Sequence, residues 1–110
     1  MPSYSKNEVV LVRYPFSDLS SAKVRPAVVV NFAHVSRDVL IVPLTSKTAS
    51  LLAGEFVLAE WRKAGLNVET AVKRGIFTIH QRLILKSVGG LSSVDAEKLE
   101  GSLHDWLGSH

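Results

Sequence analysis

Short runs of β-branched and aliphatic residues, bounded by prolines, constrain this fold more than any other feature of the sequence. Three such runs meet a proline: residues 8–14 before Pro15, residues 27–33 after Pro26, and residues 39–42 before Pro43. Runs of this kind are typical of strands, and a proline removes a donor from the hydrogen-bond ladder. The sequence therefore predicts strands that begin or end at these prolines.

Shorter patterns predict further elements. Three segments fit strands: residues 55–58, 70–74 and 83–88. Three others fit loops or irregular turns: residues 17–24, residues 45–50, and residues 76–81, which also fit a short helix. Residues 60–64, followed by Gly65, predict one or two helical turns closed by a C-cap glycine.

Only the C-terminal segment predicts a long helix. Ser92 or Ser93 can cap its N-terminus, where Asp95 and Glu97 suit the helix dipole, and Gly108 follows its end. Apolar residues recur along one face: Ala96, Leu99, Leu103 and Trp106. We expect this stripe to pack against the sheet or a second subunit. The fold class expected is mainly β with a C-terminal helix, arranged as a small barrel with the helix beside it.

Length and composition exclude several classes of protein. The 110 residues, 46% of them apolar, suffice for one domain spanning residues 1–110. Because cysteine is absent, disulfides, iron–sulfur clusters and cysteine-ligated zinc are excluded. The histidines stand far apart and no nucleotide-binding or zinc-protease motif occurs, so we expect no metal or cofactor. No signal-peptide pattern or membrane-length apolar run is present, so we expect a cytoplasmic protein without membrane contact.

Charge is distributed unevenly along the chain. Residues 95–110 carry four acidic side chains and one lysine, a net charge of −3. Because the whole chain carries +3, residues 1–94 carry a net charge of +6. A basic body favours a polyanionic or acidic partner, although ordinary solvated surface explains the charge equally well.

Two polar features are candidates for phosphate chemistry. Arg25 lies between a polar loop and a predicted strand, and Pro26 fixes the backbone after it, so its guanidinium is suited to gripping a phosphate. Thr45, Ser46 and Lys47 stand at the exit of a strand, where hydroxyls and N–H groups can hold phosphate oxygens. The structural alternatives are a surface arginine paired with a carboxylate, and a turn cap.

These residues belong to an ordered set of sequence blocks. The first three are Glu8-Val-Val-Leu-Val-Arg-Tyr-Pro-Phe-Ser-Asp-Leu, Lys23-Val-Arg-Pro-Ala-Val-Val-Val and Val39-Leu-Ile-Val-Pro-Leu-Thr-Ser. Later blocks are Gly65-Leu, Val72-Lys-Arg, Phe77-Thr-Ile and Val88-Gly-Gly-Leu-Ser. Together they resemble the MazF/PemK toxins of bacterial type II toxin–antitoxin systems over about residues 6–107. The resemblance implies a homodimer of SH3-like barrels, a fold shared with CcdB-type toxins.

The resemblance also implies a metal-independent, sequence-selective endoribonuclease that cuts single-stranded RNA. The roles that the family gives to catalytic residues fall on Arg25 and Thr45, with Ser46 beside Thr45. Attack by the 2′-OH would give a 2′,3′-cyclic phosphate and a 5′-OH. Some relatives use an acidic residue in the block before Thr-Ile, where this chain has Arg74 at or next to that position. The general base therefore stays open between Arg25, a distant His80 and a water.

Other cations and rings are expected to bind RNA. Lys23, Lys47, Lys73 and Arg74 can line a basic groove, and Tyr14 or Phe16 can offer a ring for an unstacked base. His80 is a further candidate for contact with the substrate. The same surface suits an antitoxin with an acidic, partly disordered segment.

Two alternatives to this function remain at the sequence level. One is a non-enzymatic gyrase inhibitor of the CcdB type, for which the C-terminal residues would matter rather than Arg25. The other is an RNA-binding barrel without catalysis, because the acidic residue is missing near Arg74.

Overall fold

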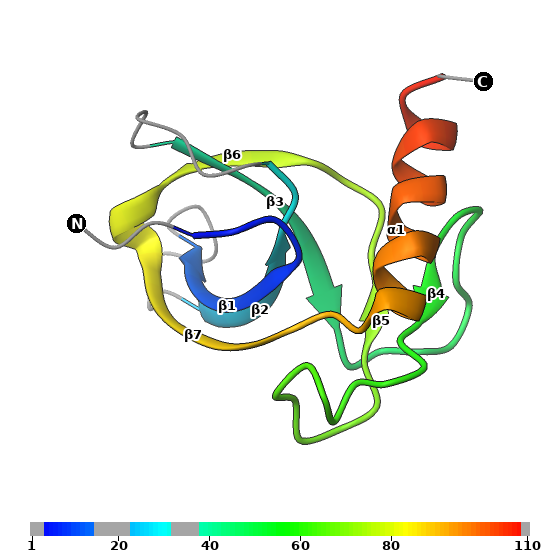
Figure 1. Ribbon diagram of the computed structural model, residues 1–110, viewed down its shortest axis with the longest axis horizontal. Coiled ribbons are helices and arrows are strands. Elements are labelled where there is room, and N and C mark those ends of the chain that lie inside the picture. The colour runs from blue at the N-terminus through cyan, green and yellow to red at the C-terminus, as the bar shows by residue number, and fades with distance from the viewer. Residues whose placement is uncertain (1–3, 15–22, 32–37, 109–110) are drawn as a thin grey trace.

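One curved antiparallel sheet forms the body of the protein, and a single α-helix lies against it (Figure 1). The computed structural model describes residues 4–14, 23–31 and 38–108. Its elements are β1 (Glu8–Tyr14), β2 (Lys23–Val29), β3 (Asp38–Thr45), β4 (Phe56–Val57), β5 (Ala71–Val72), β6 (Phe77–His80), the 3₁₀ turn η1 (Gln81–Leu83), β7 (Ile84–Gly90) and α1 (Ser93–Trp106). The strands follow the order β4-β5-β3-β2-β1-β7, and β6 also pairs with β3.

Strand β3 is the centre of the sheet and has two successive neighbours on one side. Its first half pairs with β6, up to Ile41 opposite Phe77, and its end pairs with β5, where Thr45 lies opposite Ala71. The prediction that this strand ends at Pro43 is wrong. Pro43 lies where the neighbour changes from β6 to β5, so its missing N–H interrupts neither ladder, and its carbonyl accepts the N–H of Lys73 at 3.0 Å.

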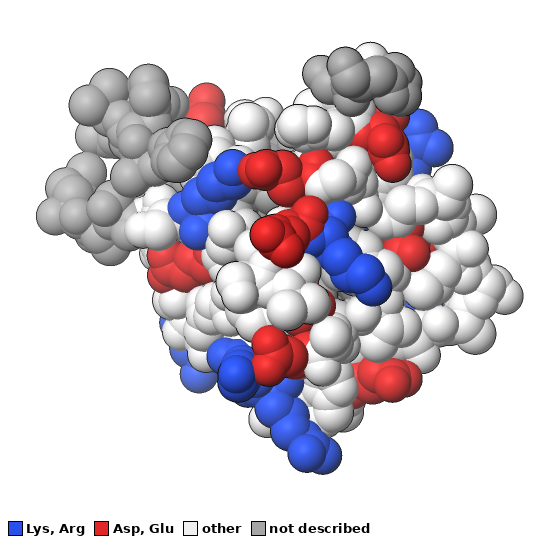
Figure 2. Space-filling view, turned by 45° about the vertical axis from the view of Figure 1, so that its right-hand side comes forward, with Lys and Arg blue, Asp and Glu red and all other residues white. Residues whose placement is uncertain are grey.

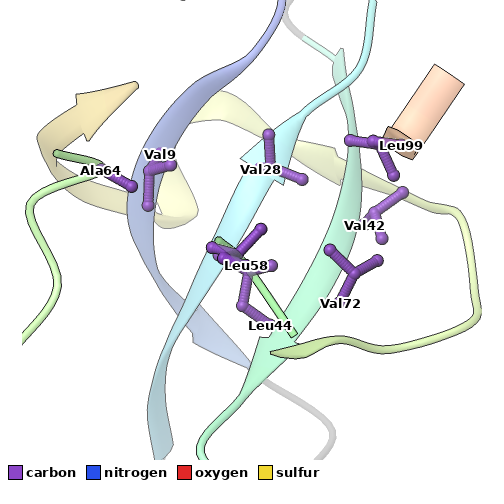
Figure 3. Packing of buried hydrophobic residues seen from close by; sticks show 8 residues of the cluster. All are labelled: Val9, Val28, Val42, Leu44, Leu58, Ala64, Val72 and Leu99. Atoms are coloured by element: carbon purple, nitrogen blue, oxygen red, sulfur yellow. The ribbon is translucent and has the colours of Figure 1, made fainter. Parts of the chain in front are cut away.

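Alternation along the strands separates two cores on opposite faces of the sheet. The first core faces α1 and contains Val9, Val28, Val42, Leu44, Leu58, Ala64, Val72 and Leu99, which converge from the strands, the loops and the helix (Figure 3). The second core lies inside the curl of the sheet and contains Val10, Val12, Ala27, Val29, Val39, Ile41, Ile79 and Ile84. The turn η1 joins β6 to β7, and the sheet is not closed by hydrogen bonds between these two strands in the described chain. The expected fold class, mainly β with a C-terminal helix, is confirmed.

Helix α1 has the ends that the sequence predicts. The Ser92 side chain caps it by accepting the N–H of Asp95, and Gly108, at φ 74°, follows it. Leu99 is 1% exposed in the first core, and Leu103 and Trp106 pack around that core. The apolar stripe therefore packs on the sheet. None of the helices in the described chain is long and apolar enough to cross a membrane.

A buried carboxylate joins the start of α1 to the loop before it. Asp95 is fully buried, and its two oxygens accept the N–H groups of Ala59 at 2.8 Å and Glu60 at 2.9 Å. The helical turns expected at residues 60–64 shorten to a single turn. It closes as a Schellman motif at Gly65, φ 85°, with the N–H of Leu66 donating to the Trp61 carbonyl at 3.1 Å.

Other boundaries also differ from the sequence prediction. The strands predicted at residues 55–58, 70–74 and 83–88 form as β4, β5 and β7 with the bounds given above. The loop expected up to residue 24 ends before Lys23, because Val24 and Lys23 pair with β1. The strand after Pro26 ends at Val29 rather than continuing to residue 33. Residues 77–80, expected as a turn or short helix, form β6 because Ile79 reaches the second core and the segment pairs with the first half of β3.

Candidate active site

The ends of three strands bring most of the candidate residues to one edge of the sheet. Tyr14 ends β1 opposite Lys23, the first residue of β2. The β2–β3 ladder ends at Ala27 opposite Pro43, and the same register continued by two residues faces Arg25 toward Thr45. We call this edge the basic end; it comprises Lys23, Arg25, Thr45, Ser46, Lys47, Lys73 and Arg74.

Arg25 projects from the face of the sheet that carries the second core. It pairs with the fully buried Val12, and the next residue on its own face is the fully buried Ala27. Arg25 itself is exposed, since the sheet continues past the core at this edge. No ion pair to Arg25 forms among the described residues. Its charge is therefore not neutralised by a described carboxylate, in contrast to the simple surface alternative.

Thr45 lies half-buried at the end of β3, on the same face as Arg25 by strand alternation. Its Oγ1 accepts the N–H of Lys47 at 3.1 Å. This bond fixes the hydroxyl and uses one lone pair, so its proton remains available to a ligand. Thr45 thus caps a turn and can still donate a hydrogen bond. Ser46 and Lys47 follow it and are exposed.

Lys73 and Arg74 come to the same edge through β5. The N–H bond from Lys73 to the Pro43 carbonyl continues the β3–β5 register, which sets Lys73 on the face that carries Thr45. Both side chains are exposed. The register therefore adds two cations to the edge that holds Arg25.

A carboxylate that the sequence did not indicate, that of Glu55, binds the backbone of the segment that carries these cations. Glu55 Oε2 accepts the N–H of Arg74 at 2.7 Å, and its Oε1 accepts the N–H of Leu52 at 2.7 Å. The pKa of Glu55 is lowered from its usual 4.5, first by the hydrogen bond from the N–H of Arg74 and then by that from Leu52. The charges of Lys73 and Arg74 also lower this pKa, and burial of the carboxyl opposes these effects. A glutamate 19 residues before Arg74 gave no sequence signal for this contact.

One candidate residue, His80, lies away from the basic end, and another falls outside the described residues. His80 pairs with Asp38, the first residue of β3, whereas Thr45 is the last residue of that strand. Its Nδ1 accepts the N–H of Arg82 at 3.1 Å and so caps η1. Phe16 lies outside the described part of the chain. No group of three or more metal-ligating side chains occurs in the residues that the structure describes.

Two of the acidic side chains in the C-terminal segment, residues 95–110, form contacts within the chain. Asp95 is buried on backbone N–H groups, and Glu100 forms an ion pair with Lys6 at 3.0 Å. The bond from Lys6, then its charge, lowers the pKa of Glu100. Figure 2 accordingly shows acidic and basic side chains interspersed over much of the face it presents, with lysine and arginine gathered at its lower left.

Several solved structures share this fold at low sequence identity. A MazE–MazF complex from Deinococcus radiodurans matches with a TM-score of 0.81 at 16% identity, over 100% of both chains. An endoribonuclease in complex with its cognate antitoxin, from a mycobacterial species, matches with a TM-score of 0.75 at 16% identity, over 96% of this chain and 95% of that one. The Mycobacterium tuberculosis toxin MazF-mt6 matches with a TM-score of 0.74 at 16% identity, over 94% and 98%.

Sequence comparison identifies the family directly. No curated protein is similar enough in sequence to be matched. The family model described as the PemK-like, MazF-like toxin of type II toxin–antitoxin systems matches residues 5–107, nearly the whole chain. The chain belongs to the PemK-like, MazF-like toxins of type II toxin–antitoxin systems.

Proposed function

We propose that this toxin is a metal-independent endoribonuclease that cuts single-stranded RNA, with Arg25 and Thr45 as its catalytic residues. One observation carries the proposal: strand alternation sets Arg25, which forms no ion pair with a described residue, and the fixed hydroxyl of Thr45 on the same face at one edge of the sheet. Several solved structures of this fold are named endoribonucleases, which agrees with the proposal.

The chemistry requires little beyond these groups, because RNA supplies its own nucleophile. The 2′-OH attacks phosphorus, the bond from O2′ to phosphorus forms, and the bond from phosphorus to O5′ breaks, which leaves a 2′,3′-cyclic phosphate. The departing O5′ takes up a proton to become a 5′-OH. Arg25, charged at any physiological pH, stabilises the negative charge on the phosphoryl oxygens, and Thr45 donates a hydrogen bond that orients the phosphate.

The group that accepts the proton of the 2′-OH has to lie at the basic end and be free to accept it. His80 lies toward the opposite end of β3, and both oxygens of Glu55 already accept backbone N–H groups, with the pKa of this carboxyl lowered. Both are therefore poor candidates for taking the proton of the 2′-OH. A water held at the site remains for this step, because the charged guanidinium of Arg25 has no lone pair that could accept a proton.

The basic end also defines the expected partners. Lys23, Lys47, Lys73 and Arg74 bind the phosphates that flank the cut, with Ser46 and Tyr14 at the same edge. An acidic, partly disordered segment of an antitoxin covers this edge and blocks RNA. A solved endoribonuclease of this fold in complex with its cognate antitoxin supports this part of the proposal. We place the toxin in the cytoplasm as a homodimer, where RNA and antitoxin are both available.

The test is cleavage of a long single-stranded RNA in EDTA, with the ends of the products mapped. We expect the wild type to leave cyclic phosphates, and Arg25→Ala to be slower by about 100-fold or more, the usual effect of removing a charge-stabilising donor. Arg82→Ala is the matched control, because Arg82 is also exposed but follows His80 away from the basic end. Intact RNA with the wild type would contradict the proposal, and inhibition of gyrase supercoiling would then be measured.

A further inference from the structure

An exposed aromatic ring lies beside the basic end without a role in the chemistry above. Phe77 is 41% exposed and is the only aromatic residue among the exposed large apolar side chains of the described chain. By contrast, Trp61 lies under the guanidinium of Arg62, and Trp106 donates its indole N–H to the Ala53 carbonyl. Phe77 thus leaves a large part of its ring open to a ligand, which neither tryptophan does to the same extent.

The register of β3 connects Phe77 to the phosphate-binding groups. Phe77 pairs with Ile41, and Lys73 binds Pro43, two residues further along the same strand. Residues two apart in a strand point to one face and lie about 7 Å from each other. Phe77 beside Ile41, Lys73 beside Pro43, and Thr45 at the end of β3 therefore follow one another along one face of the sheet.

The backbone of Gly75 holds one side of the ring. A Cβ added to Gly75 would lie 3.0 Å from Cε2 of Phe77 and 3.4 Å from its Cζ, so only glycine allows the chain to approach the ring this closely. Gly75 also has a φ of 147°, which other residues rarely adopt. Arg74, just before it, is fixed by its bond to Glu55. The ring is thus supported on a fixed segment while a large part of it faces solvent.

We propose that Phe77 forms a nucleobase subsite, on which one unpaired base of the RNA stacks while Lys73 and Arg74 hold adjacent phosphates. The subsite rests on the proposed function and adds to it a group that contacts bases rather than phosphates. A flat apolar ring next to cations is the arrangement that binds single-stranded nucleic acid, because every base has a face that can stack. It also makes affinity depend on the base at this position, since purines and pyrimidines stack with different strengths.

The experiment measures the binding of 2′-O-methyl RNA, which lacks the nucleophile and stays intact. Phe77→Leu, which removes the ring, should weaken binding by about 5- to 100-fold, whereas Phe77→Trp, which keeps a ring, should bind as the wild type does. The affinity of Phe77→Leu should depend on salt with the wild-type slope, because the phosphate contacts remain. Leu85→Ala, which truncates an exposed apolar side chain on β7, is the control and should bind as the wild type does. Gly75→Ala should mimic Phe77→Leu by displacing the ring.

Each outcome separates the subsite from the proposed function. If the wild type binds RNA and Phe77→Leu binds it equally well, the subsite is refuted and the ribonuclease stands. If Phe77→Leu changes the oligomeric mass of the protein in solution, the ring serves contact between two copies, which also refutes the subsite. If the wild type does not bind RNA at all, the proposed function itself fails.

Discussion

Replacing Asp95 by alanine should destabilise the fold more than any other substitution of an acidic residue in the described chain. The side chain is fully buried, and its carboxylate accepts two backbone N–H groups, those of Ala59 and Glu60. A donor left without its acceptor costs about 1–3 kcal/mol, so the two together cost about 2–6 kcal/mol. Loss of the negative charge at the helix N-terminus adds about 0.3–1 kcal/mol. We therefore expect a loss of about 2–7 kcal/mol, and a lowering of Tm on the order of 10 °C or more.

The assay is urea unfolding followed by circular dichroism, with Glu97→Ala as the control. Glu97 is exposed on the same first turn of α1 and should change the free energy of unfolding by less than about 0.5 kcal/mol. Asp95→Asn keeps one accepting oxygen and should fall between the wild type and Asp95→Ala. If Asp95→Ala were as stable as Glu97→Ala, the contact between α1 and the loop would not stabilise the fold and the reasoning would be refuted.

Three further substitutions test other parts of the fold. Leu99→Ala should cost about 2–5 kcal/mol in chemical unfolding, because this side chain is buried in the first core. Gly65→Ala should give poorly folded protein by circular dichroism, since its Cβ would lie 1.9 Å from a carbonyl oxygen of β7. Glu55, whose pKa is lowered below 4.5, should stabilise the fold above that pH and lose this contribution as the pH falls through its folded pKa. The difference in stability between wild type and Glu55→Gln should thus shrink as the pH falls below 4.5, and a difference independent of pH would contradict this assignment.

Elements with local signals were predicted well from the sequence. Strand β1 has the predicted bounds, Glu8–Tyr14, because a continuous β-branched run ends at a proline. Helix α1 begins after a serine cap and is followed by a glycine, both of which act on the adjacent backbone. These signals are complete within a few residues of chain. No long-range contact is needed to read them.

Features set by distant contacts were missed. Strand β3 continues through Pro43 because its neighbour changes there, which no local pattern indicates. The site shows the same limit. Arg25 and Thr45 stand out as residues at strand ends, but the contact of Glu55 with Arg74 and the pairing of Phe77 depend on how strands align. Asp95 was correctly expected at a helix N-terminus, yet its stronger role, binding a loop 35 residues earlier, was not visible.

The separation of the two cores by strand alternation has a consequence for errors in folding. If β2 slipped by a single residue against β3, every side chain of β2 would move to the opposite face. Val28 would leave the helix side, and Arg25 would turn away from Thr45. A misaligned chain would thus lose its core and the proposed site together. On the proposed function, only molecules with correctly paired strands would cut RNA.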